Sequence, residues 1–237
     1  MIQIYNSIED INKEAADLFV AASQKAISEK GQFTAVLTGG SSPAGIYKLL
    51  ASADYKNKVD WSKVFIFWGD ERWVPLDDER SNAKMSFDTL LSHVPIPKEN
   101  IFEMYSDGVK PEEYAVTYEN SIKNILGSEG KFDLILLGMG DDGHTASLFP
   151  GEEVLKEETK WVDAYYLKPQ EMYRITLTAP LINKAEKIVV VAFGEKKAPA
   201  LHEVLKGEFN PTKYPMQLIK PVSGELLFLV DQNAAGK

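Results

Sequence analysis

The chain of 237 residues is 44% hydrophobic, carries a formal net charge of −9 and contains no cysteine, so it can bury a substantial core but can form no disulfide. Its acidic balance and the absence of a Lys/Arg-rich block argue against nucleic-acid binding, because phosphate backbones attract basic surfaces. We expect a cytoplasmic protein that binds no membrane, since the N-terminal sequence lacks a signal-peptide pattern and no segment reaches the roughly 18 consecutive apolar residues of a membrane helix.

The N-terminal segment predicts one amphipathic helix. Ser7 and Asp10 resemble a capping box, and apolar residues recur at helical spacing between residues 11 and 26. Gly31 then offers a stop.

Beyond Gly31, short apolar runs alternate with segments of helical periodicity. Strands are predicted over residues 33–38, 64–68, 134–137, 188–193 and 226–230, and helices over residues 111–126 and 196–206. This alternation predicts an α/β fold with one doubly wound, mostly parallel sheet flanked by helices. Residues 173–178 alternate apolar and polar side chains, so a small antiparallel addition paired with residues 161–166 stays open. Since no Pro/Gly/Ser-rich linker divides the chain, we expect a single domain over residues 1–237.

Four of the predicted strands end in polar, loop-like residues. In open α/β sheets, ligands bind beyond the carboxyl ends of the strands, near the point where the strand order reverses. We expect one cleft to collect these ends, which comprise residues 38–42, 70–72, 142–144 and 194–197.

The first of these ends is the turn Gly39-Gly40-Ser41-Ser42-Pro43. Its backbone N–H groups can face an anion, because a helix N-terminus has unpaired donors and a partial positive charge. Ser42 can cap the following helix and Pro43 can occupy its first turn. Taken alone, the motif fits a plain capped turn better than a phosphate site, because glycine-serine turns are common.

Arginine occurs at only three positions, Arg72, Arg80 and Arg174. Arg72 directly follows a strand, beside two carboxylates, and its planar guanidinium can clamp a phosphate or polarise a carbonyl oxygen. A solvated charge cluster is the alternative. Arg174 begins an alternating strand and is a candidate for a phosphate contact or, equally, a surface residue. Lys197 is a further candidate, because it lies at the start of a predicted helix.

The three histidines differ in their surroundings. His93 and His202 lie at the end of a predicted helix and within one, where a structural or exposed role is expected. His144 follows a buried strand and a glycine-rich turn, with Asp142 two residues before it, so a carboxylate can orient its imidazole for general-base activation of water. We expect no metal site, because no two ligand residues show a helical i, i+4 metal spacing.

Residues 138–143 also match the dinucleotide pattern GxGxxG, and Asp163 falls at the spacing of a ribose-binding carboxylate. However, Pro150-Gly151 interrupts the short helix predicted after this turn. Asp141-Asp142 would also place two negative charges beside a pyrophosphate. A nucleotide-linked oxidoreductase therefore ranks below hydrolysis.

Four motifs carry a family resemblance in this order: TGGSSP, GDERWVPLDDERSN, DLILLGMGDDGHTASLFPG and RITLT. Over residues 33–231 the chain resembles the 6-phosphogluconolactonases of the glucosamine-6-phosphate isomerase/6-phosphogluconolactonase superfamily. The resemblance implies a Rossmann-like domain, no metal or organic cofactor, and a sugar-phosphate lactone of the oxidative pentose phosphate pathway as substrate. We expect a monomer or a weak homo-oligomer.

The resemblance also implies roles for individual residues. His144 would take a proton from the water that attacks the lactone carbonyl, Asp142 would support it, Arg72 would stabilise the oxyanion or hold the anionic substrate, and Asp70 would shape the same wall. The phosphate would be held by Gly39, Gly40, Ser41, Arg174 and Lys197.

Related deaminases carry a glutamate five residues after the histidine and a DEY strand end. This chain has Phe149 and Asp70-Glu71-Arg72 at those positions, which favours ester hydrolysis. Asp141 is a mild departure, since family members often carry proline or another residue there. A non-catalytic sugar-phosphate sensor on the same fold is the alternative from a different functional class.

Overall fold

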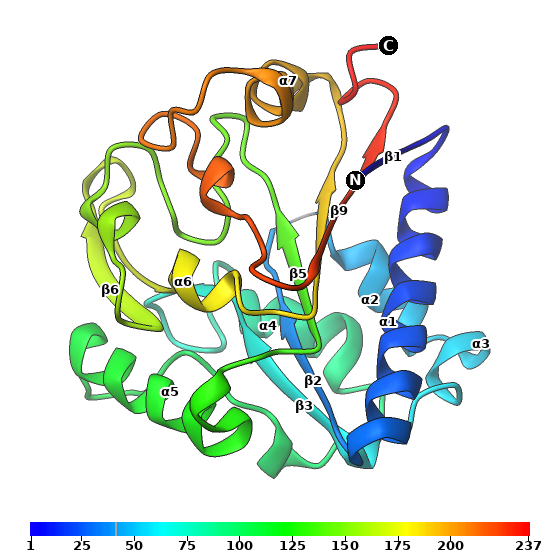
Figure 1. Cartoon of the computed structure of the whole chain (residues 1–237). Helices are drawn as coiled ribbons and strands as arrows, with labels where there is room; N and C mark the ends of the chain where they lie inside the picture. Colours follow the sequence, from blue (N-terminus) through cyan, green and yellow to red (C-terminus); the bar gives the residue numbers. More distant parts are fainter. Residues whose placement is uncertain (41) are drawn as a thin grey trace.

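In the computed structural model, which describes residues 1–40 and 42–237, a six-stranded parallel sheet forms the centre of the protein (Figure 1). Its strand order is β1-β9-β8-β5-β2-β3. The strands are β1 (Ile2–Tyr5), β2 (Phe33–Leu37), β3 (Val64–Trp68), β5 (Leu134–Gly138), β8 (Lys187–Ala192) and β9 (Glu225–Asp231). Every neighbouring pair in this sheet is parallel, which confirms the predicted α/β architecture.

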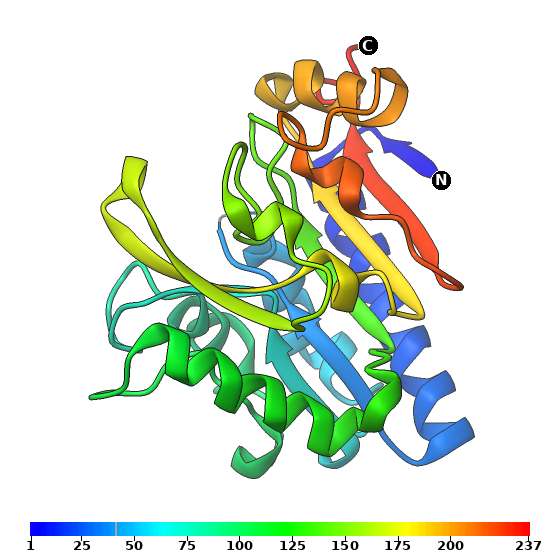
Figure 2. The same ribbon diagram turned by 60° about the vertical axis from the view of Figure 1, so that its left-hand side comes forward.

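A second, antiparallel sheet has the order β4-β7-β6 and contains β4 (Asp70–Arg72), β6 (Val162–Leu167) and β7 (Met172–Leu177). The β6–β7 hairpin extends away from the main sheet (Figure 2). Gly69 joins the two sheets, because its N–H donates to the Leu37 carbonyl at 2.9 Å and its carbonyl accepts from the Leu177 N–H at 2.8 Å. The antiparallel pairing that the sequence left open is therefore present.

Helices cover both faces of the parallel sheet. The longer ones are α1 (Ile8–Lys30), α2 (Ala44–Ala51), α5 (Pro111–Leu126) and α7 (Ala198–Lys206), and the short ones are α3 (Ala53–Lys56), α4 (Asn82–Ser86) and α6 (Ala179–Ile182). A π-helical turn spans Phe87–Leu91, and 3₁₀ turns span Trp61–Lys63, Lys98–Asn100, Gly127–Glu129, Glu153–Lys156, Lys168–Gln170, Glu195–Lys197 and Pro215–Leu218. α1 and α2 lie on one side of the sheet, whereas α5 lies on the other and packs against β6 and β7 (Figures 1 and 2). None of the helices in the described ranges is long and apolar enough to cross a membrane.

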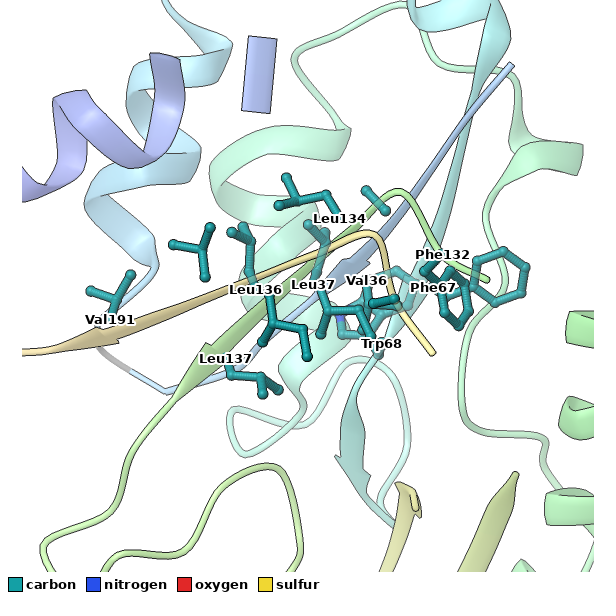
Figure 3. Packing of buried hydrophobic residues seen from close by; sticks show 14 of the residues in the cluster. Val36, Leu37, Phe67, Trp68, Phe132, Leu134, Leu136, Leu137 and Val191 are labelled. Atoms are coloured by element: carbon teal, nitrogen blue, oxygen red, sulfur yellow. The ribbon is translucent and has the colours of Figure 1, made fainter. Parts of the chain in front are cut away.

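The core lies along the central strands, where β2 buries all five of its residues. Strands covered on both faces read as continuous apolar runs, as FTAVL does here. Phe67 of β3 stacks on Phe102 with ring centroids 4.4 Å apart. It also meets Phe132 edge-on, among the buried side chains of the core (Figure 3). This packing fixes the strands from which the polar loops depart.

The strand order reverses between β2 and β5. From β2 the chain continues to β3 on one side, and from β5 it continues to β8 on the other. The connections after β2 and β5 therefore leave in opposite directions, which opens a crevice at the carboxyl ends of these two strands.

The local signals at the N-terminus are confirmed. The Ser7 hydroxyl accepts from the Asp10 N–H at 3.1 Å, and Gly31 ends α1 with a left-handed φ of 80°. At α2, by contrast, Pro43 rather than Ser42 occupies the N-cap position, without a side-chain cap. The predicted strand and helix positions otherwise agree with the structure to within two residues.

Three features differ from the sequence-based expectation. β1 and β4 were not predicted, because each has only three or four residues and depends on a partner strand that is distant in the sequence. The short helix expected after His144 is absent. Residues 145–149 instead form a loop closed by an antiparallel bridge between Thr145 and Leu148.

Tyr47 of α2 fixes the end of β2. Its buried hydroxyl accepts from the Thr38 N–H at 2.9 Å and donates to the Thr38 carbonyl at 2.8 Å. Burial raises the pKa of the Tyr47 hydroxyl, so the group stays protonated at neutral pH. The glycine turn after β2 thus begins from a fixed position.

Replacing Tyr47 with Phe is expected to lower the free energy of unfolding by about 1–3 kcal/mol, because it leaves a buried N–H and a buried carbonyl without this partner. Urea denaturation monitored by circular dichroism measures the change. The control Tyr166→Phe removes the hydroxyl of a residue that is 45% exposed and should leave stability unaltered. Equal stability of the two variants would contradict the structural role of the Tyr47 hydroxyl.

Candidate active site

A cavity of about 270 Å³ lies in the crevice between the ends of β2 and β5. Its wall contains seven of the predicted site residues: Gly39, Gly40, Asp70, Arg72, His144, Arg174 and Lys197. Asp142 lies behind His144, hydrogen-bonded to its ring. Ser41 lies outside the described residues. The four strand ends that the sequence pointed to therefore meet at one site.

His144 is held by Asp142. Oδ1 of Asp142 lies 2.6 Å from the imidazole Nδ1 and accepts from the backbone N–H of His144 at 3.0 Å. Burial pushes the pKa of the Asp142 carboxyl upward, but the hydrogen bonds and charge of His144 outweigh this effect and leave the pKa below its usual value. The ionised carboxylate favours the tautomer with the proton on Nδ1, so Nε2 is left as the proton acceptor.

The turn that carries this pair is closed by backbone hydrogen bonds. Gly140 N–H donates to the His144 carbonyl at 2.8 Å, and Gly143 adopts a left-handed φ of 79°. A Cβ on Gly140 would lie 2.0 Å from Nδ1 of His144 and 2.6 Å from Oδ1 of Asp142. Position 140 therefore has no room for a side chain. At position 143, glycine is favoured because it adopts a positive φ without strain.

The loop after His144 is tied to the antiparallel sheet through Ser147. The Ser147 hydroxyl donates to Asp70 Oδ2 at 2.5 Å, and its carbonyl accepts from the Tyr165 hydroxyl at 2.7 Å. Ala146 holds a left-handed φ of 47°, a conformation uncommon outside glycine. The loop thereby turns back and places the ring of Phe149 on the imidazole of His144.

Two arginines form the wall contributed by the small sheet. Arg72 and Arg174 are paired residues of β4 and β7. Arg72 donates from Nη1 to the Arg80 carbonyl at 2.7 Å, and Arg174 lies 3.7 Å from Asp70 and donates to Gln170. Among the described residues, neither buried Nε has a hydrogen-bond partner. Burial lowers the pKa of Arg174 against the attraction of Asp70, but a guanidinium remains charged.

Glu71 and Asn82 are polar residues at the site that the sequence did not indicate: Asn82 lines the cavity and Glu71 is buried beside it. The Glu71 carboxylate is 1% exposed and accepts from the backbone N–H groups of Arg72, Asn82 and Ala83 and from the Ser81 hydroxyl. Burial raises the pKa of Glu71, and these backbone donors oppose the rise. The sequence signal that could have indicated Asn82 is the pair Ser81-Asn82 at the end of the motif GDERWVPLDDERSN.

Asn82 connects Asp70 with the glycine turn after β2. Its Nδ2 donates to the Asp70 carbonyl at 2.8 Å. A Cβ on Gly39 would lie 1.8 Å from Asn82 Oδ1, so this glycine permits the close approach of the two segments. Gln170, on the turn of the β6–β7 hairpin, also lines the cavity and was not predicted.

Lys197 follows β8 and closes the rim of the cavity. Its Nζ lies 2.7 Å from Oδ1 of Asp141, so the negative charge of Asp141 has a cationic partner. Among the described residues, no group of three His, Asp or Glu side chains is arranged to hold a metal ion.

The family model for glucosamine-6-phosphate isomerases/6-phosphogluconolactonase matches residues 6–228. The chain belongs to this family. A 6-phosphogluconolactonase from Synechocystis sp. is 42% identical over 214 residues, which are 89% of this chain and 86% of the relative.

Two solved structures bear on the fold. The 6-phosphogluconolactonase from Trypanosoma brucei has a TM-score of 0.86 at 25% identity, over 100% of this chain and 97% of that one. A monomeric glucosamine-6-phosphate deaminase has a TM-score of 0.85 at 19% identity, over 99% and 98% of the two chains. The second likeness concerns the fold alone, so the side chains of the cavity must distinguish hydrolysis from deamination.

Proposed function

We propose that this chain hydrolyses 6-phospho-D-glucono-1,5-lactone to 6-phosphogluconate in the oxidative pentose phosphate pathway. The observation that carries the proposal is the His144–Asp142 pair at a cavity that is also lined by two arginines, Arg72 and Arg174. Family membership and the name of the Synechocystis relative support the same reaction.

In the first step, Nε2 of His144 takes a proton from a water molecule as the water oxygen attacks the lactone carbonyl carbon. The resulting imidazolium is stabilised by the Asp142 carboxylate at Nδ1. General-base assistance of this kind contributes typically about 10²- to 10⁴-fold in rate.

The attack moves negative charge onto the carbonyl oxygen. Arg72 is our candidate for stabilising this oxyanion, because its charged guanidinium lines the cavity. When the tetrahedral intermediate collapses, the ring C–O bond breaks and protonated His144 returns its proton to the leaving oxygen. Asp70 supports the step indirectly, since it holds Arg174 and the loop that carries His144.

The substrate phosphate is assigned to the cationic side of the cavity. Backbone N–H groups of Gly39 and Gly40 adjoin the start of α2, and Arg174 and Lys197 supply positive charge. A phosphate would replace Asp141 as the partner of Lys197. The contribution of Ser41 stays a sequence-based prediction.

Deamination is disfavoured by Phe149, which lines the cavity where the related deaminases carry a glutamate. We further propose that the chain acts in the cytoplasm as a monomer or weak homo-oligomer and as a single domain over residues 1–237. The family resemblance implies that the reaction needs no metal or organic cofactor.

The test is the release of acid from 6-phosphogluconolactone by purified protein, after subtraction of spontaneous hydrolysis. We expect turnover well above the background, no ammonia from glucosamine 6-phosphate, and a much lower kcat/KM for unphosphorylated glucono-1,5-lactone. A rate equal to the background would refute the proposal, and equal efficiency on the two lactones would refute the phosphate contacts. Binding of 6-phosphogluconate without turnover would indicate the sensor instead.

Replacing Gly140 with Ala should lower kcat about 10²-fold, since a displacement of about 1 Å in a catalytic group has a cost of that order. The added methyl group would collide with both His144 and Asp142. The control Gly69→Ala adds the same group where its nearest neighbours lie at ordinary contact distances of 3.6–3.8 Å. Full activity of Gly140→Ala would show that the pair does not depend on this close fit.

A further inference from the structure

The ring of Phe149 covers one face of the His144 imidazole. The two ring centroids are 4.1 Å apart and the planes differ by 25°. Phe149 is 9% exposed, and the guanidinium carbon of Arg174 lies 5.6 Å from the centroid of the same ring. Phe149 thus contacts both the proposed base and a cationic residue of the cavity wall.

The position of Phe149 is set by a closed series of contacts. The Ser147 hydroxyl bonds Asp70 at 2.5 Å, Asp70 lies 3.7 Å from Arg174, and Arg174 lies over Phe149. Because Ser147 and Phe149 belong to the loop that begins at His144, this series returns to its starting point. The Phe149 ring is therefore held both by its own loop, through Ser147, and by Arg174.

A general base must hold its lone pair in a defined direction, and for imidazole this pair lies in the plane of the ring. The hydrogen bond at Nδ1 lies along one edge of the His144 ring and restrains its rotation from that edge. The Phe149 ring packs on the face of the imidazole with the centroids 4.1 Å apart, so it opposes tilting of the imidazole plane, which would weaken the stacking or bring atoms of the two rings too close. Asp142 and Phe149 thus restrain the same imidazole, one at its edge and the other at its face.

We propose that Phe149 is a positioning residue that fixes the plane of the His144 imidazole, so that Nε2 points at the attacking water. The inference rests on the proposed lactonase function and deepens it. It assigns to Phe149 an effect on the chemical step rather than on substrate binding. An aliphatic side chain of similar volume fills the same space but offers no flat surface.

The test compares Phe149→Leu with Phe149→Tyr, which keeps the ring. In the Leu variant, kcat should fall about 10- to 100-fold through misorientation of the base. KM for 6-phosphogluconolactone should stay within about twofold of the wild-type value, since the substrate contacts are retained. The Tyr variant should keep kcat within about threefold. Phe209→Leu, at a residue 62% exposed, is the matched control.

A spectroscopic signature gives a reading that does not depend on activity. The Hε1 resonance of His144, assigned with His144→Ala, should move in Phe149→Leu as the ring-current shift of the stacked ring is lost, and should stay in place in Phe149→Tyr. If Phe149→Leu does not fold, Phe149→Met provides the same comparison with a flexible side chain.

Three results would overturn the inference: an unchanged kcat in the Leu variant, a loss carried by KM, or equal damage from Leu and Tyr. If the wild-type protein itself lacks lactonase activity, the proposed function fails. In that case the resonance of His144 still reports whether the Phe149 ring stacks on the imidazole, so the two failures are distinguishable.

Discussion

The buried carboxylate of Asp70 joins the segments that form the cavity. It is 6% exposed, accepts from Ser147 at 2.5 Å and lies 3.7 Å from Arg174, while Asn82 binds its backbone carbonyl. A carboxylate removed from water must be paired and hydrogen-bonded, because its desolvation is otherwise strongly unfavourable. The partners of Asp70 come from three segments: Ser147 from the loop after His144, Arg174 from β7 and Asn82 from the start of α4. Pairing Asp70 therefore brings these three segments to the end of β3. The catalytic geometry follows from this requirement, since the loop fixed by Ser147 also carries His144 and Phe149.

The same wall concentrates positive charge in a protein that is negative as a whole. Two of the protein's three arginines, Arg72 and Arg174, line the cavity. The third, Arg80, accepts a hydrogen bond from Arg72 at its backbone carbonyl. Two guanidinium groups on one wall give the cavity a local positive charge, which favours a negatively charged ligand. An anionic substrate meets that condition. Local charge, and not the net charge of −9, governs what this site attracts.

Much of the fold could be predicted because its strands are continuous apolar runs, as at residues 33–37 and 134–137, and α1 carries its own cap and stop. His144 and Asp142 could be found because they are neighbours in sequence. β4 could not be predicted, because its three charged residues form a strand only by pairing with β7, which lies about one hundred residues later in the chain. The loop at 145–149 was mistaken for a helix because its conformation depends on Asp70 and Tyr165. The roles of Asn82 and Gln170 likewise arise from contacts that no local pattern encodes.

The central claim is that His144 activates water in this cavity. The most direct measurement is the background-corrected turnover of 6-phosphogluconolactone by His144→Ala beside the wild-type protein and His202→Ala, whose imidazole is exposed on α7. We predict a loss of about 10²- to 10⁴-fold in kcat for His144→Ala with an unaltered unfolding transition, and wild-type turnover for His202→Ala. Near-normal turnover by the folded His144→Ala protein would contradict the claim.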